Sequence, residues 1–289
     1  MPLPNGVLAN EYLKQLQNKK DNETPSISLD DYFDTLTGPA VMSLFTQQDI
    51  STISKIITKI PRIQEKKNKI NEILTPRGYQ FLYSGTNRVL YSYLDNPNFI
   101  IKIALDNVGQ TDSPREYINQ KIIKPYCCKI FDVDPTGTIA TIEKVVPITT
   151  LEEFMYAFDW YTSIIFHKFI SIYATEDLAE DKFMNFGIRQ NPQSFCVLDF
   201  PYIYKIDHKK LVCNNKRKDQ FGNYIYCGGA IDYTYDFNSF KCTRCGKKYT
   251  GIDLIDASPD IAPLLKIQDG KVIFDSDHDY TYSNPNRVC

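Results

Sequence analysis

Hydrophobic positions follow a helical period in the N-terminal part of the chain. Isoleucines recur at helical spacing between residues 48 and 74, with a break near Pro61, and predict an amphipathic helical region interrupted there. Apolar residues between positions 6 and 20 have similar spacing. They predict a helix that either packs on its own domain or serves as an arm for a partner. Ser28 and Asp31 have the spacing of a capping box and predict a helix start.

The pattern then changes to that of β-strands. Residues 79–84, 89–94 and 98–104 are rich in aromatic and β-branched side chains and predict three strands. Lys102 lies in the middle of the third segment, within Ile-Ile-Lys-Ile. A charged side chain there needs either a partner or an exposed face.

A long helix and a hairpin are expected further along the chain. The apolar pattern of residues 149–172 predicts the helix. Two short apolar runs flank turn residues 191–193, so a hairpin places Asn185 and Asp199 at the same end. An amide oxygen beside a carboxylate suits Mg²⁺. An ordinary hairpin with polar ends is the alternative.

Together with Lys102, this hairpin resembles the nucleotide site of the protein-kinase-like fold. In that family an Asn and the Asp of an Asp-Phe-Gly turn hold Mg²⁺ on ATP, and Asn185 and Asp199 match them in order and rough spacing. The resemblance implies that Lys102 meets the α- and β-phosphates, and that Glu116 on the following helix is its partner. It also implies that Glu143 belongs to the hinge strand, whose backbone meets adenine.

The chain departs from the family pattern at several positions. The phosphate-covering turn keeps only Gly85, which a plain hairpin explains equally well. Glu180 stands where the family has its catalytic Asp, Asp181 is one residue nearer to the Asn, and Pro201 replaces the Gly of the metal-binding turn. Two functions remain open. One is an Mg-ATP-dependent phosphotransferase acting on a protein or other hydroxyl acceptor, with Glu180 or Asp181 as its carboxylate. The other is a catalytically inactive scaffold.

A second group of residues has the chemistry of a metal site. Cys242-Thr-Arg-Cys245-Gly has zinc-knuckle spacing, because two thiolates of one tight turn can share a tetrahedral ion. Cys227-Gly-Gly has the form of the end of a second knuckle, but the remaining ligand, Cys213, lies far upstream. The four cysteines predict a structural zinc site. A redox pair at Cys242 and Cys245, or free cysteines, are the alternatives.

Basic and aromatic residues are interleaved around these cysteines. Such a surface can bind a protein partner or nucleic acid, and a solvated face of a structural module is the alternative. The basic residues are Lys209, Lys210, Lys216, Arg217, Lys218, Lys241, Arg244, Lys247 and Lys248.

Composition and charge narrow the class of protein. The 289 residues are 43% hydrophobic, enough for one large or two modest cores. A formal net charge of −2 argues against a surface that coats nucleic acid or membrane as a whole. No apolar run reaches the length of a membrane span, and the N-terminus lacks a signal-peptide pattern. We therefore expect a cytoplasmic protein without a membrane partner. The abundance of Lys, Asn, Ile and Tyr also fits a viral or phage protein in the host cytoplasm or virion.

The expected fold class is α+β. The resemblance implies a two-lobed protein-kinase-like fold with an N-terminal helical extension and a small zinc ribbon. The expected divisions are the helical extension at 1–75, the small lobe at 76–148, the large lobe at 149–207, the zinc ribbon at 208–250 and a C-terminal segment at 251–289.

Overall fold

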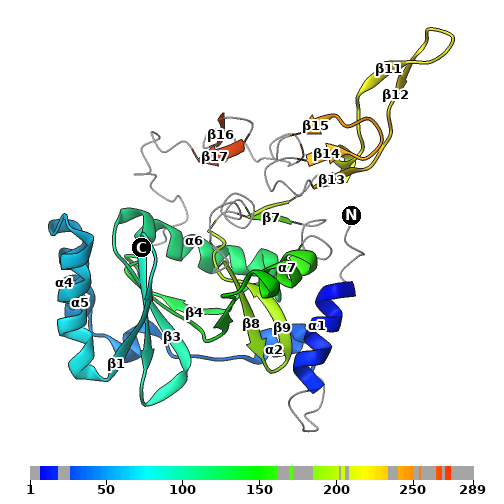
Figure 1. Cartoon of the computed structure of the whole chain (residues 1–289). Coiled ribbons are helices and arrows are strands. Elements are labelled where there is room, and N and C mark those ends of the chain that lie inside the picture. Colours follow the sequence, from blue (N-terminus) through cyan, green and yellow to red (C-terminus); the bar gives the residue numbers. More distant parts are fainter. Residues whose placement is uncertain are drawn as a thin grey trace. The chain divides into compact units, whose positions relative to one another are not determined.

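The protein is an α+β protein with antiparallel sheets (Figure 1). The computed structural model describes residues 7–18, 27–161, 169–171, 185–201, 203–205, 208–233, 240–249, 254, 265–268 and 271–274. The chain divides into two compact units. Unit 1 is Met1–Ile165 with Phe183–Ile203, and unit 2 is Phe166–Lys182 with Tyr204–Cys289.

Unit 1 begins with helices whose ends follow from their sequences. They are α1 (Val7–Asn18), α2 (Leu29–Thr35), α3 (Val41–Leu44), α4 (Gln47–Lys59) and α5 (Ile63–Leu74). Ser28 accepts a hydrogen bond from the backbone N–H of Asp31 and caps α2, which confirms the predicted helix start. Pro61 lies in the break between α4 and α5, as the pattern predicts.

Helix α1 packs on unit 1 and does not form a separate arm. The ring of Tyr12 stacks on that of Tyr156 in α7 (Leu151–Trp160), with centroids 4.4 Å apart. The backbone N–H of Ala9 donates to Oδ2 of Asp159 at 3.1 Å. These contacts confirm the simpler of the two predictions for this helix.

The centre of unit 1 is a five-stranded sheet in the order β1-β2-β3-β5-β4. Its strands are β1 (Tyr79–Ser84), β2 (Arg88–Tyr93), β3 (Asn96–Ala104), β4 (Ile130–Val133) and β5 (Ile139–Glu143), and the short helix η1 (Thr75–Arg77) leads into β1. The register pairs Ile103 with Val89 on one side and with Ile139 on the other. This face forms the main core with the apolar sides of α4 and α5. Residues 41–74 and the sheet therefore share one core.

The opposite face of the sheet carries Lys102. It pairs with Leu90 and Ala140, one position along the strand from Ile103, and successive side chains of a strand point to opposite faces. Helix α6 (Asn107–Ile123) follows β3 and is capped by Asp106, which accepts a hydrogen bond from the N–H of Gly109 at 2.8 Å. Helix α6 supplies Glu116, the ion-pair partner of Lys102. One face of the sheet therefore packs in the apolar core, and the other carries a buried ion pair.

The predicted hairpin is present at the end of unit 1. Strands β8 (Phe186–Gln190) and β9 (Gln193–Val197) join β6 (Val146–Pro147) in a three-stranded sheet. Phe186 pairs with Val197, and the N–H of Leu198 donates to the carbonyl oxygen of Asn185 at 2.8 Å. The register therefore confirms that Asn185 and Asp199 lie at the same end of the hairpin.

The helix expected over residues 149–172 is shorter than predicted. Helix α7 ends at Trp160, and Phe169–Ser171 form β7, which pairs with β10 (Ile203–Lys205). The helical prediction is therefore wrong at β7, while residues 162–168 and Ile172 lie outside the described residues. An apolar segment with Phe and Ile suits either state, and a partner strand from elsewhere in the chain decides between them.

Unit 2 consists of short strands in its described part. After η5 (His208–Leu211), β11 (Lys216–Lys218) pairs with β12 (Tyr224–Tyr226), and β13 (Ile231–Tyr233), β14 (Phe240–Cys242) and β15 (Lys248–Tyr249) form a three-stranded sheet. Near the C-terminus β16 (Leu265–Gln268) pairs with β17 (Lys271–Phe274). None of the helices in the described ranges is long and apolar enough to cross a membrane.

Candidate functional site

Lys102 and Glu116 form a buried ion pair in unit 1. The ammonium Nζ of Lys102 lies 2.6 Å from Oε2 of Glu116, with only 9% and 1% of the two side chains exposed. Lys102 comes from the middle of β3 and Glu116 from the middle of α6. The charge in the apolar strand is thus stabilised by a carboxylate across the same face.

Arg88 connects this pair to Asp199. Its guanidinium lies 2.8 Å from Oε1 of Glu116, 2.7 Å from Oδ1 of Asp199 and 3.8 Å from Oδ2 of Asp112. Arg88 begins β2 and lies on the same face as Leu90, two residues later. Asp112 and Glu116 are four residues apart on α6, so both can face Arg88. The cluster therefore joins two cations and three carboxylates.

The carboxylates of this cluster have different proton affinities. Burial raises the pKa of Asp112 to about 7, against the attraction of Arg88. Burial also raises the pKa of Asp199, but the charges of Arg88 and Lys102 outweigh it and hold that pKa below its usual range. Asp199 is therefore ionised at neutral pH, while Asp112 titrates near it. Oδ1 of Asp112 is buried without a hydrogen-bond partner among the described residues.

Asn119 holds the chain that follows Asp199. Its Nδ2 donates to the carbonyl oxygens of Phe200 at 3.2 Å and Pro201 at 2.8 Å. Asn119 lies seven residues after Asp112, close to two helical turns, so one side of α6 supplies both contacts. On the neighbouring strand of the hairpin, Asn185 is buried immediately before β8. The turn with Asp199 is thus fixed against α6.

The other residues predicted for the nucleotide site fall elsewhere. Gly85 donates its N–H to the carbonyl of Arg88 at 2.9 Å, and a Cβ added there would meet its nearest atom at 3.8 Å, so this turn does not require glycine. Glu143 shares the face of Phe99, opposite to that of Lys102. Glu180 and Asp181 lie outside the described residues.

Glu143 is committed to contacts within unit 1. Its Oε1 lies 2.8 Å from Nε of Arg189 and accepts from Tyr32 Oη at 3.1 Å. Its backbone N–H donates to the carbonyl of Lys129 at 2.7 Å. Arg189 is completely buried, so the pair is a structural ion pair that joins β5 to the hairpin β8–β9. The structure therefore does not bring Glu143 to Lys102, Glu116 and Asp199.

The sequence interpretation missed Arg88, Asp112 and Asn119. The last two share a helical period with Glu116, and this spacing was the available signal. Arg88 lies an even number of residues from Leu90 in the same strand, which assigns it to that face. Nothing in the sequence shows that three carboxylates meet there.

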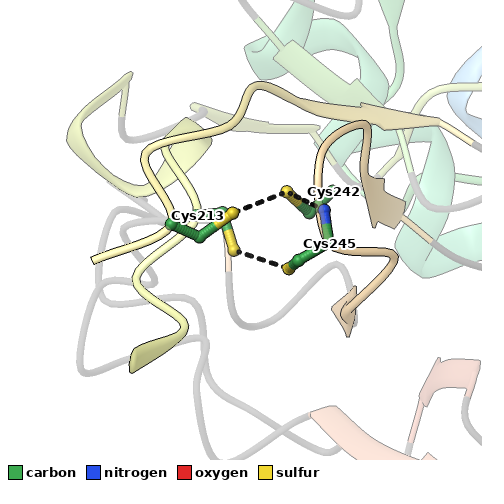
Figure 2. Close-up of side chains that lie close together, drawn as sticks. Cys213, Cys242 and Cys245 are labelled. Atoms are coloured by element: carbon green, nitrogen blue, oxygen red, sulfur yellow. Dashed lines mark hydrogen bonds between the residues drawn. The ribbon is translucent and has the colours of Figure 1, made fainter. Parts of the chain in front are cut away.

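The four predicted cysteines of unit 2 come together from two hairpins. Cys213 precedes β11 and Cys227 follows β12, while Cys242 ends β14 and Cys245 precedes β15. Their sulfur atoms all lie within 4.8 Å of one another, and Figure 2 shows three of these residues converging. The hairpin β11–β12 explains why Cys213 is far from Cys227 in sequence.

The separations of the sulfur atoms fit a shared ion. Cys213 and Cys245 are 3.6 Å apart and Cys227 and Cys242 are 3.7 Å apart, measured between Sγ atoms. A disulfide bond would be about 2.05 Å long. Four thiolates about 2.3 Å from a tetrahedral zinc ion would lie about 3.8 Å from one another. The four-cysteine cluster can therefore hold a metal ion such as zinc.

Hydrogen bonds stabilise the thiolates of this cluster. The backbone N–H groups of Arg244 and Cys245 donate to Sγ of Cys242 at 3.4 and 3.5 Å, and Tyr249 Oη donates to Sγ of Cys213 at 3.0 Å. A hydrogen bond from the backbone of Lys247 is the main cause that lowers the pKa of Cys245 to about 6. Since thiolates rather than thiols bind metals, these contacts favour metal binding at Cys242 and Cys245. Burial acts in the opposite direction at Cys227 and raises its pKa to about 11.

Two glycines let the hairpins approach each other. Gly246 follows Cys245 with φ of +74°, a left-handed conformation that glycine adopts without strain. A Cβ on Gly229 would lie 2.7 Å from Sγ of Cys242 and 2.6 Å from Cβ of Arg244. The glycines of both Cys-Gly sequences therefore serve the geometry of the cluster.

Comparison with known proteins gives no further guide to this site. No protein-family model matches the chain, and no curated protein matches it.

Proposed function

We propose that unit 1 is a kinase-like unit that binds a magnesium–nucleotide complex. The observation that carries this proposal is the convergence of Lys102, Glu116 and Asp199, which come from a strand, a helix and the end of a hairpin. Their order along the chain is that of the kinase-like nucleotide site. The side chain of Lys102 is the group for the nucleotide phosphates, and Glu116 orients it.

The magnesium ligands of this proposal are Asn185 and Asp199. Asp199 is ionised, and both residues lie at one end of the hairpin β8–β9. Carboxylate and amide oxygens are hard ligands that suit Mg²⁺, which also keeps several waters and binds phosphate oxygens. Asn119 acts as a positioning residue, because it holds the carbonyl groups that follow Asp199.

The position of Arg88 favours a catalytically inactive scaffold as a second candidate function. Its guanidinium already neutralises Asp199 at 2.7 Å, so an incoming Mg²⁺ competes with an internal cation for this carboxylate. Phosphoryl transfer also needs a positioned carboxylate at the acceptor hydroxyl, and this role would fall to Glu180 or Asp181. The ion pair of Arg88 therefore supports a catalytically inactive, partner-binding scaffold over a phosphotransferase.

We also propose that the metal of unit 2 is zinc with a structural role. Four cysteine ligands form a closed coordination shell, which is typical of structural sites, whereas catalytic zinc keeps an open position. The described core of unit 2 is small, and a bound ion supplies the stability that such strands lack.

Calorimetry with Mg-ATP tests the nucleotide site on the full zinc-loaded chain. We expect wild type to bind, and Lys102→Met and Asp199→Asn to lose binding. Lys66→Met is the matched control, because Lys66 is also buried but its ammonium donates to the carbonyl of Leu105 at 2.6 Å, from α5. Equal binding by wild type and Lys102→Met would contradict the proposed site.

A fourth variant distinguishes a nucleotide site that Arg88 blocks from the absence of a nucleotide site. Arg88→Gln removes the internal cation from Asp199 and should strengthen Mg-ATP binding. If wild type does not bind but Arg88→Gln does, the site exists and Arg88 closes it. If neither folded protein binds, unit 1 is a scaffold without a nucleotide.

A further inference from the structure

The two-stranded ribbon β11–β12 has two chemically different faces. Its antiparallel register pairs Lys216 with Tyr226, Arg217 with Ile225, and Lys218 with Tyr224. Because side chains alternate along a strand, one face carries Lys216, Lys218, Tyr224 and Tyr226. We call this surface the Lys–Tyr face. The other face carries Arg217 and Ile225, so each face provides a control for the other.

The rings of the Lys–Tyr face are open to solvent. Tyr224 is 70% exposed and Tyr226 is 65% exposed, and Phe221 in the connecting turn is 79% exposed. Single exposed apolar side chains are common on protein surfaces, but three large aromatic rings on one short ribbon form a patch. Exposed apolar surface of this kind is available for contact with another molecule.

Each tyrosine of the Lys–Tyr face has a cation beside it. The ammonium of Lys216 lies 5.7 Å from the ring centroid of Tyr226, and that of Lys218 lies 5.4 Å from the ring centroid of Tyr224. Both distances fall within the range of cation–π attraction, which keeps the positive charges along the rings. The face therefore places a row of two tyrosine rings on β12 beside a row of two lysine charges on β11.

The charge of the surrounding module extends this pattern. Basic side chains dominate the described residues 208–233 and 240–249, where the acidic residues are Asp219 and Asp232. The metal cluster lies at the base of the ribbon, because Cys213 and Cys227 flank it. Bonds from the N–H of Cys213 to the carbonyl of Gly229, at 2.9 Å, and from the N–H of Gly228 to the carbonyl of Cys213, at 3.0 Å, close this base. The ribbon is thus a basic hairpin whose base lies at the proposed zinc site.

We propose that the Lys–Tyr face binds single-stranded nucleic acid without sequence preference. Aromatic rings stack on bases and lysines neutralise phosphates, and this combination is typical of single-strand binding. Tyr224 and Tyr226 are two residues apart on one strand, so their rings repeat at about 6.7 Å. That repeat is about twice the 3.4 Å rise per base of a duplex strand, and it suits an extended strand with separated bases. A duplex keeps its bases stacked away from such rings.

Two other partners fit the same surface less well. An acidic peptide would use the lysines but would leave the exposed ring faces uncovered. An anionic membrane would meet the turn of the ribbon, where the carboxylate of Asp219 accepts bonds from the N–H groups of Phe221 and Asn223 at 2.8 Å. A negative charge at that position opposes insertion of the turn into an anionic surface.

Fluorescence anisotropy on the full zinc-loaded chain tests the proposal with a labelled 12-nucleotide oligo-dT. We expect binding that is tighter than to a 12-base-pair duplex. Tyr224→Ala and Tyr226→Ala should each weaken it at least roughly 5-fold. Tyr224→Phe should bind as wild type, because phenylalanine still stacks. Each of Lys216→Gln and Lys218→Gln should lower the slope of log affinity against log salt by about 0.7.

Control variants distinguish base stacking on the tyrosine rings from nonspecific electrostatic binding. Ile225→Ala lies on the opposite face and should leave binding unchanged, and zinc content checks that every variant remains folded. The proposal is overturned if oligo-dT does not bind at low salt, if the duplex binds more tightly, or if both tyrosine variants bind as wild type. Tighter binding to a poly-glutamate peptide, or to vesicles with phosphatidylserine, would assign the face to those partners instead. Every substitution in this test lies in unit 2, so the differences between the variants and wild type do not depend on the proposed nucleotide site of unit 1.

Discussion

Asp112 is a buried carboxyl whose charge lowers the stability of unit 1. Its pKa rises from 3.8 to about 7 on burial, although Arg88 attracts its charged form. The folded protein therefore holds this proton more tightly than the unfolded chain does between those two values. The contribution of Asp112 to the free energy of unfolding falls as the pH rises through that range and is constant above it. We expect Asp112→Asn, which keeps the shape and removes the charge, to abolish this fall.

Urea unfolding at several pH values measures this effect. The variant should exceed wild type by up to about 4 kcal/mol near pH 8, and by less near pH 5. Asp49→Asn is the control, because this substitution should lower the free energy of unfolding instead of raising it. Burial raises the pKa of Asp49, but hydrogen bonds from Thr46 outweigh it and lower that pKa, so its charge stabilises the protein. A stability difference for Asp112→Asn that does not change with pH would contradict the prediction.

Sequence reasoning identifies single residues best where a side chain violates the local pattern. Lys102 stands out because it interrupts an apolar strand, and Asp199 because it ends one. Arg88 and Asp112 do not stand out, since each occupies a segment that tolerates polar residues. Their importance follows from the packing of β2 against α6, which neither segment specifies alone. The structural role of Glu143 is also hidden in the sequence, because its buried partner Arg189 lies 46 positions away.

At the scale of elements, Gly229 controls how closely the two cysteine hairpins approach. An added Cβ would crowd Cβ of Arg244 at 2.6 Å and Sγ of Cys242 at 2.7 Å, so Gly229→Ala forces the two cysteine hairpins to shift at the proposed zinc site. We expect this substitution to weaken zinc binding roughly 10-fold or more, by analogy with other changes around metal ligands. Competition with a chromophoric chelator measures the affinity.

Gly228→Ala is the matched control for this prediction. Gly228 has φ of +62°, but a Cβ there would meet nothing within 4 Å. Its substitution strains the backbone by roughly 1–2 kcal/mol without displacing a ligand. Zinc affinity should therefore stay closer to wild type than in Gly229→Ala. Equal losses in the two variants would show that backbone strain, and not crowding of Cys242, governs the site.

Elements with a strong local period are predictable, and elements made by distant pairing are not. The helices α4 and α5 and the strands β1 to β3 follow their hydrophobic patterns closely. Phe169–Ser171 continue an apolar pattern but pair with β10, and that partner comes 32 residues later in the chain. The cysteine cluster is only partly predictable from the sequence. Its Cys-x-x-Cys half is visible in sequence, whereas the other half depends on the pairing of β11 with β12.

For the whole molecule, the α+β class that the sequence predicts is present, and α4 and α5 lie in the same compact unit as the sheet that follows them. Residues 41–74 share a core with the sheet that follows them, because the apolar sides of α4 and α5 cover one face of it. A change from helical to strand period at residue 78 gives no sign of this shared core. The four clustered cysteines, in contrast, all belong to unit 2. If they hold the proposed zinc ion, each unit has its own source of stability.

Metal removal should consequently act on one unit and not on the other. Trp160 is the only tryptophan of the chain and lies buried in unit 1, with its ring 5.8 Å from that of Phe195. Its fluorescence reports the unfolding of unit 1 alone. We expect a zinc chelator to leave the thermal midpoint of this signal unchanged, while the four cysteines become reactive towards a thiol reagent. In the proposed zinc site, the chelator removes the ion that these four cysteines would share between β11–β12 and β14–β15.

A variant without the metal site supplies the control for this experiment. Cys227→Ser removes one of four ligands, so it should match the chelated wild type in thiol reactivity and respond no further to chelator. The Trp160 midpoint of this variant should equal that of wild type. A lower midpoint in both the variant and the chelated protein would mean that the ion stabilises unit 1 as well. A lower midpoint with chelator alone would instead identify a second metal ion, bound outside the cysteine cluster.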